Sequence, residues 1–268
     1  ELGSLAESFN SMVPKLRDRL HVREALELAR EVQQNLLPAS APVIPGFDVA
    51  ARSVYCDETG GDYFDFFDLS DIAPGKHAVV VGDVTGHGIA AALLMTTARA
   101  LLHARVTESD EMAGVIGRVN ANLARDARSG QFMTLFYLLL DAETRHARWV
   151  SAGHDAAIVF DSGTGEFNEY PGHDIPLGIE GAWVFNEASE QLPARAIAVI
   201  GTDGIWEARS PDGEMYGKDR FRETIRRHAE HTSDEIADAI LADVTAFRAG
   251  GDQADDITVV ILKTNPNG

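Results

Sequence analysis

Four apolar segments of this sequence each border an aspartate with glycine close by, and this recurrence constrains the fold more than any other feature. The aspartates stand in Gly61-Asp62, Gly82-Asp83, Asp203-Gly204 and the run of residues 252–258. An aspartate at a strand end places a short carboxylate at the rim of a sheet, and glycine lets backbone or ligand approach closely. A single Asp-Gly pair more commonly marks a turn. Several such ends at one rim would form an all-oxygen site for hard divalent cations such as Mg²⁺ or Mn²⁺.

The charge balance and the cysteine count exclude several kinds of protein. The 268 residues carry a formal net charge of −19. A chain this acidic is not expected to bind nucleic acid through a phosphate-neutralising surface, nor to dock on anionic lipid. The single cysteine, Cys56, excludes an intrachain disulfide and a Cys-based zinc site.

The sequence shows no membrane-spanning pattern. No apolar run reaches the roughly 18 residues of a membrane-spanning helix. The first residues, Glu1 to Ser4, do not resemble a signal peptide. We therefore expect this piece to be soluble and cytoplasmic.

Residues 4–37 are predicted to form a helix. Apolar residues recur at helical spacing in two stretches, Leu5, Phe9, Met12 and Leu16, then Val22, Leu26, Ala29 and Leu36. The register breaks near residues 17–23, and Pro14 is expected to kink or interrupt the helix. The pattern fits a signalling stalk or dimer seam as well as an amphipathic helix packed on its own domain, because the heptads are too few to decide.

A proline-rich connector, residues 38–46, separates this helical region (1–37) from a domain of residues 38–268. Strands are predicted at 47–55, 62–69, 77–84, 132–141, 146–152, 155–160, 196–202 and 257–263, and helices at 87–105, 110–127, 218–229 and 234–248. The last helix has a Thr232-x-x-Glu235 capping box and a Gly250-Gly251 stop. Strands and helices cluster rather than alternate, which favours an α+β fold with largely antiparallel sheets.

Taken in order, the motifs resemble those of the PPM (PP2C-like) metal-dependent protein phosphatases, in particular the bacterial SpoIIE/RsbU branch. The motifs are Gly60-Gly61-Asp62-Tyr63-Phe64-Asp65, Gly82-Asp83-Val84-Thr85-Gly86-His87-Gly88, Ser151-Ala152-Gly153-His154, Thr202-Asp203-Gly204 and Asp255-Asp256-Ile257-Thr258. The resemblance covers residues 30–264. It implies a PP2C-like β-sandwich flanked by helices, two Mn²⁺ or Mg²⁺ ions at one edge, and phosphoserine or phosphothreonine proteins as substrates.

The resemblance also implies roles for individual residues. Asp62, Asp83, Asp203 and Asp255 match the catalytic aspartates that hold the metal ions, and Val84 matches a residue that contributes a backbone carbonyl. Two bound ions activate water for in-line displacement, and no covalent enzyme intermediate is needed. The implied substrate is a phosphorylated STAS-like regulatory protein.

Two other classes of function were weighed against the phosphatase. The first is a catalytically inactive PP2C-like partner-binding module, which the presence of all four aspartates disfavours. The second is a Ca²⁺-binding module, but the EF-hand spacing of oxygen ligands is absent.

Residues 1–12 resemble the closing segment of a HAMP signalling domain. This likeness implies that the chain is the cytoplasmic output domain of an inner-membrane receptor, with the layout of the SiaA type of receptor phosphatase. The membrane would be reached only through upstream segments. The likeness also implies a homodimer formed through the N-terminal helix.

Some residues near the motifs depart from the family pattern or have more than one interpretation. Eukaryotic relatives hold the phosphate with an arginine a few residues before the first metal aspartate, whereas this chain has Asp57 there and Arg52 further upstream. Phosphate binding is therefore expected to depend mainly on the metal ions. His87 is a candidate general acid, although a role in capping the following helix is favoured. Cys56 is expected to pack within a strand, since no adjacent base is evident to activate it.

Other polar residues near the motifs are given structural roles. His154 is expected to be a buried, hydrogen-bonded histidine, and Asp65 and Asp68 to face solvent. Asp256 either contacts a metal ligand without contacting the ion, and so holds that ligand in place, or lies at the surface. Asp252 is a candidate ligand for a third metal ion.

Overall fold

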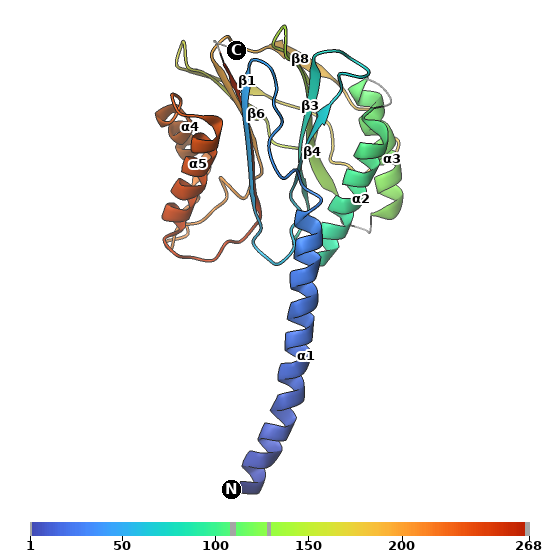
Figure 1. Cartoon of the computed structure of the whole chain (residues 1–268), viewed down its shortest axis with the longest axis vertical. Helices are drawn as coiled ribbons and strands as arrows, with labels where there is room; N and C mark the ends of the chain where they lie inside the picture. The colour runs from blue at the N-terminus through green and yellow to red at the C-terminus, as the bar shows by residue number, and fades with distance from the viewer. Residues whose placement is uncertain (1, 108–110, 128–129, 266–268) are drawn as a thin grey trace.

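Two five-stranded sheets lie face to face in the computed structural model, and a pair of helices covers the outer face of each sheet (Figure 1). The model describes residues 2–107, 111–127 and 130–265. The helices are α1 (Leu2–Gln34), α2 (Ile89–Arg105), α3 (Met112–Asp126), α4 (Gly217–Arg227) and α5 (Ser233–Arg248). The strands are β1 (Phe47–Val54), β2 (Tyr63–Asp68), β3 (Lys76–Val84), β4 (Met133–Asp141), β5 (His146–Ala152), β6 (Ala157–Asp161), β7 (Glu166–Tyr170), β8 (Ala188–Gln191), β9 (Ala196–Gly201) and β10 (Ile257–Thr264).

The strand order places the aspartate-bearing strands in both sheets. One sheet has the order β1-β10-β9-β6-β7 and the other β2-β3-β4-β5-β8. All neighbouring strands in these two sheets pair antiparallel. The predicted α+β fold with antiparallel sheets and flanking helices is therefore confirmed.

The central strands are buried on both faces, which explains their continuous apolar sequences. Along β3, Val79 and Val81 belong to the core between the sheets, whereas Val80 packs with α2 and α3. Along β10, Val260 faces the core between the sheets, and Val259 packs with α4 and α5. Alternate side chains of a strand point to opposite faces, so each central strand contributes to two of the three apolar layers.

The predicted capping signals of α5 are confirmed. Thr232 Oγ1 accepts from the backbone of Glu235, and the Glu235 side chain accepts from the backbone of Thr232. The helix ends at Ala249 in a left-handed conformation, and Gly250 follows with φ +86°. These contacts satisfy backbone groups that the helix itself leaves unpaired.

Helix α1 projects away from the sandwich and joins it at its C-terminal end (Figure 1). Pro14 lies inside one continuous helix, so the predicted interruption there is wrong. Gln33 attaches the last turn to the domain: its Nε2 donates to the Gly60 carbonyl at 2.7 Å, and its Oε1 accepts from the Gly60 N–H at 3.1 Å. Further from the domain, Leu20 and Leu28 are about 60% exposed. Among the side chains of α1 that the structure describes, those near its C-terminal end therefore make the contacts with the domain.

The model differs from the sequence prediction in a few other elements. Strands β7 and β8 were not predicted, and both are edge strands with mostly exposed residues. Residue 110, the predicted first residue of the helix that begins at Met112, lies outside the described residues, as do the side chains of Leu5 and Phe9. Among the described residues, no helix combines the length and apolar composition needed to span a membrane.

Candidate metal centre

The four predicted metal aspartates stand at strand ends of both sheets. Asp62 immediately precedes β2 and Asp83 is the next-to-last residue of β3, whereas Asp203 follows β9 and Asp255 precedes β10. The charges of Asp203 and Asp255 both act on the carboxyl of Asp83, which in turn reaches the carboxyl of Asp62. The fold thus brings together residues that are almost 200 positions apart in sequence.

Asp62 is the buried member of this cluster, and the half-buried Asp83 lies beside it. Asp62 is only 1% exposed, and its pKa is raised well above the usual range, first by burial and then by the charge of Asp83. Burial and the charges of Asp203 and Asp255 raise the pKa of Asp83 to about 8. Two carboxylates held this close resist ionisation unless a cation joins them.

The other two aspartates add to the negative charge. Burial, followed by the charge of Asp255, raises the pKa of Asp203 to about 6. Burial also raises the pKa of Asp255. No lysine or arginine among the described residues forms an ion pair with any of the four aspartates.

The donor set fits hard divalent cations. It consists of carboxylate oxygens, which Mg²⁺ and Mn²⁺ prefer. Within the described part of the chain, no three of the aspartate carboxylates come within 4.8 Å of one another. Which of them ligate, and whether the Val84 carbonyl does so, stays a prediction.

Two residues behind the cluster hold Asp62 and its loop in place. Thr202 Oγ1 donates to Asp62 Oδ2 at 2.8 Å and itself accepts from the Thr258 N–H at 2.9 Å. The Asp256 carboxylate accepts from the Cys56 N–H at 2.8 Å and from the Gly61 N–H at 2.7 Å. Asp256 is buried, so of its two predicted roles the surface one is wrong, and its bond to the Gly61 N–H is compatible with the supporting one. The supporting role of Thr202 was not predicted.

The glycines beside the aspartates are required by close packing, as predicted. A Cβ on Gly61 would lie 2.7 Å from the Val84 carbonyl oxygen, and one on Gly204 would lie 1.9 Å from the carbonyl oxygen of Asp256. Both distances are too short for a real side chain. Larger residues at these positions would force apart the loops that carry Asp62 and Asp203.

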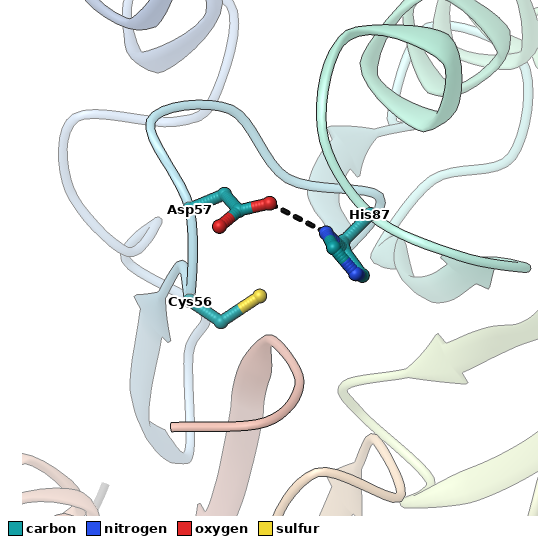
Figure 2. Close-up of side chains that lie close together, drawn as sticks. All are labelled: Cys56, Asp57 and His87. Carbon is teal, nitrogen blue, oxygen red and sulfur yellow. Dashed lines mark hydrogen bonds and ion pairs between the residues drawn. The ribbon is translucent and has the colours of Figure 1, made fainter. Parts of the chain in front are cut away.

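His87 and Cys56 lie beside the cluster, and the structural role that was predicted for each of them is wrong. The N-cap residue of α2 is Gly88 and no side chain caps this end, so the capping role of His87 is wrong. Instead, His87 Nδ1 donates to Asp57 Oδ2 at 2.5 Å (Figure 2).

Cys56 lies beyond the end of β1 and is partly exposed rather than packed within a strand. Burial and the charge of Asp256 raise the pKa of its thiol to about 12, so the thiol is protonated at neutral pH.

Arg52 is held away from the aspartates by two ion pairs with α5. Its Nε lies 2.8 Å from Asp238 Oδ1, and its Nη1 lies 2.9 Å from Asp234 Oδ1. These contacts agree with the expectation that Arg52 does not clamp a phosphate.

His154 is buried and hydrogen bonded, as expected. Its Nδ1 lies 2.9 Å from Thr134 Oγ1, and burial lowers its pKa to about 4. A neutral imidazole in this position links β4 to the loop after β5.

Asp65 differs from its predicted place, because it is buried rather than facing solvent. Its Oδ2 accepts from the Tyr63 hydroxyl and from His103 Nε2, each at 2.7 Å. This carboxylate therefore ties β2 to α2.

Asp68 faces solvent as predicted, and Asp252 is exposed beside a small cavity that Asp255 also lines.

Comparison with known proteins decides the family. The family model described as Stage II sporulation protein E (SpoIIE) matches residues 73–265. The chain belongs to the SpoIIE family. Protein IcfG of Synechocystis sp. is 27% identical to this SpoIIE-family chain over 99% of the chain and 46% of its own length. The phosphoserine phosphatase RsbU of Bacillus subtilis is 24% identical over 90% of the chain and 70% of its own length.

Solved structures share the fold of this SpoIIE-family domain. The SiaA-PP2C domain of Pseudomonas aeruginosa superposes with a TM-score of 0.79 at 21% identity, covering 92% of this chain and 98% of that one. The PP2C phosphatase domain of SpoIIE from Bacillus subtilis has a TM-score of 0.69 at 20% identity, covering 84% and 64% of the two chains. The PP2C-like fold expected from the motifs is confirmed. The chain spans less than half of the length of IcfG, so the activity of a whole protein is not carried over from that relative.

Proposed function

We propose that this domain is a metal-dependent phosphatase that hydrolyses phosphoserine or phosphothreonine on a protein. One observation carries the proposal: the buried Asp62 and the half-buried Asp83 face Asp203 and Asp255, with no arginine or lysine among the described residues to balance them. Without a cation the carboxylates repel one another, since the charge of each hinders ionisation of the next. Binding of divalent cations offsets this repulsion.

Each residue of the cluster would have a distinct role in binding the metal ions. Asp62, Asp83, Asp203 and Asp255, with the carbonyl of Val84, would hold two Mn²⁺ or Mg²⁺ ions. Such ions supply Lewis-acid stabilisation of the phosphoryl group and activate water for in-line displacement. Thr202 would keep Asp62 oriented through the bond to its Oδ2. With Arg52 engaged by α5, the charge of the substrate phosphate would be balanced chiefly by the ions that the aspartate cluster holds.

We infer the substrate class from the relatives. RsbU and RsbP of Bacillus subtilis, 24% and 23% identical to this chain, are both named phosphoserine phosphatases. A phosphorylated STAS-like regulatory protein is the substrate that the resemblance to this branch suggests. The inactive partner-binding module is less well supported, because the supporting contacts of Asp62 are intact as well as the aspartates themselves.

We also propose that α1 connects the domain to an upstream HAMP-containing receptor in the inner membrane and forms a homodimer on the cytoplasmic side. The support is the set of exposed apolar side chains that this helix carries. They are Met12, Val13, Leu16, Leu20, Val22, Leu28 and Val32. At helical spacing they are distributed around the helix rather than aligned on one face, so a second copy of the helix would cover some of them.

The phosphatase proposal is tested with the purified chain, an aryl phosphate and a phosphoserine peptide. We expect hydrolysis of both in Mn²⁺, loss of activity in excess EDTA, and recovery when Mn²⁺ is restored. Asp83→Asn and Asp203→Asn remove a charge and a hard oxygen donor, and each should lower the rate by at least about a hundredfold. Asp68→Asn, a change at an exposed aspartate, is the matched control. Turnover of either cluster variant within a few-fold of the wild type would overturn the assignment.

A further inference from the structure

Three side chains of different chemistry meet outside the aspartate cluster. Cys56 and Asp57 lie in the loop after β1, and His87 lies between β3 and α2. Their ligand atoms, one from each residue, all lie within 4.8 Å of one another. In Figure 2 the Asp57 carboxylate and the His87 ring are joined by a hydrogen bond, and the thiol of Cys56 points toward the same gap.

We propose that Cys56, Asp57 and His87 form a binding site for a thiophilic divalent cation of the Zn²⁺ type, separate from the aspartate cluster. Sulfur, imidazole nitrogen and carboxylate oxygen are the three ligand types that Zn²⁺ takes in proteins, and three of them leave a fourth tetrahedral position for water. The thiol and imidazole discriminate against Mg²⁺ and Mn²⁺, which prefer oxygen ligands. The proposal concerns binding, and it does not depend on phosphatase activity.

The site can open enough to admit the ion. Asp57 Oδ2 and His87 Nδ1 are 2.5 Å apart, whereas two ligands about 2 Å from a tetrahedral ion are separated by about 3.3 Å. The two side chains are 43% and 57% exposed, so a movement of this size displaces no packed neighbour. Binding replaces the proton shared by these groups, and the thiol loses its proton to the solvent.

The electrostatic surroundings favour a cation. The charges of Asp255 and Asp256 act on His87, and those of Asp255, Asp256 and Asp57 act on Cys56. The prediction from sequence that a single cysteine excludes a Cys-based zinc site holds for sites built from several thiolates. It missed a mixed site, because Asp57 and His87 are brought together only by the fold.

An ion at this site would fix two loops that flank the aspartate cluster. The backbone N–H of Cys56 is held by Asp256, which also holds Gly61, the residue before Asp62. His87 stands four residues after Asp83. A bridge between these loops would restrict the movement of one loop relative to the other.

The test uses the whole chain in excess Mg²⁺, which occupies oxygen-ligand sites, and adds Co²⁺ as a spectroscopic substitute for Zn²⁺. We expect one Co²⁺ per chain, with a sulfur-to-cobalt charge-transfer absorption in the near ultraviolet that Zn²⁺ abolishes. Cys56→Ser should remove this absorption, and His87→Gln should weaken the affinity for Co²⁺ by at least about tenfold. Both substitutions conserve size, and circular dichroism would verify that the variants are folded.

Two histidines on the opposite side of the fold provide the control. His228 and His231 have ring centroids 5.2 Å apart and could bind a metal by themselves. His231→Gln should leave the cobalt absorption and the affinity unchanged. The proposal is overturned if the wild type shows no charge-transfer absorption, if Cys56→Ser and His87→Gln bind as tightly as the wild type, or if His231→Gln removes the binding.

Discussion

The hydroxyl of Thr202 donates to the carboxylate of Asp62 at 2.8 Å, and this bond joins the end of β9 in one sheet to the start of β2 in the other. Both residues are buried. The bond fixes Oδ2 of the Asp62 carboxylate. The position of a proposed metal ligand in one sheet is therefore set by a side chain from the opposite sheet.

The first prediction tests this bond by replacing Thr202 with valine. Valine conserves the shape but removes the donor, so Asp62 loses a partner that orients it. We expect the affinity for Mn²⁺, measured by calorimetry, to fall by about 10- to 100-fold while the fold is retained. Thr202→Ser keeps the hydroxyl and should bind Mn²⁺ nearly as well as the wild type. Equal affinities in the valine and serine variants would show that the bond does not position the ligand.

The second prediction concerns the dependence of stability on pH in the absence of metal. The pKa of Asp83 is raised to about 8 in the folded chain, so the folded state binds more protons than the unfolded state between about pH 4 and pH 8. The contribution of Asp83 to the free energy of unfolding therefore falls as the pH rises through this range. In EDTA, we expect Tm to decrease by several degrees more between pH 5 and pH 8 in the wild type than in Asp83→Asn.

Adding Mn²⁺ at pH 8 should restore the Tm of the wild type and have less effect on Asp83→Asn, since the ion neutralises the carboxylates that repel one another. Parallel pH profiles for the two proteins in EDTA would contradict the raised pKa.

The third prediction concerns Arg52. Its two ion pairs with Asp234 and Asp238 lie partly in solvent, and such pairs contribute about 0–1 kcal/mol each to stability. Arg52→Ala should change KM for a phosphopeptide by less than about threefold and lower Tm slightly. An increase of KM by about a hundredfold in a folded variant, about 2.7 kcal/mol, would show that Arg52 holds the phosphate.

The fourth prediction concerns the exposed apolar side chains of α1. Replacing Leu20 and Leu28 with glutamate places like charges on both helices of a dimer, where they would repel each other. We expect the mass measured by light scattering to fall from that of a dimer to that of a monomer. Lys15→Glu, a change at an exposed polar position on the opposite face of the same helix, is the control. Unchanged mass in the double variant would exclude α1 as the dimer seam.

The sequence predicted those parts of the fold and site that depend on local patterns. The apolar strands, the capping box of α5 and the aspartates at strand ends follow from spacing and residue type alone. Strands β7 and β8 escaped prediction because they are short edge strands whose exposed side chains carry no alternation. Pro14 was predicted to kink or interrupt the helix, yet α1 continues through it, because proline disfavours a helix without forbidding it.

Contacts between distant segments were the part that could not be predicted. Asp65 was expected to face solvent because it stands in an alternating strand, but α2 packs over it and supplies His103 as a partner. The pairing of Asp57 with His87 joins loops 30 residues apart. The periodicity of a sequence does not predict such pairs, since they depend on how the sheets and helices pack against one another.

The reciprocal hydrogen bonds between Gln33 and Gly60 have a thermodynamic consequence. The loop of residues 60–62 is held at Gly60 by the last turn of α1 and at Gly61 by Asp256, directly before Asp62. If the position of α1 alters the affinity of Asp62 for a cation, the cation must alter the preferred position of α1 by the same free energy, because coupling between two sites is reciprocal. Binding of a cation at the metal centre would then change the hydrogen-exchange protection of the final turn of α1.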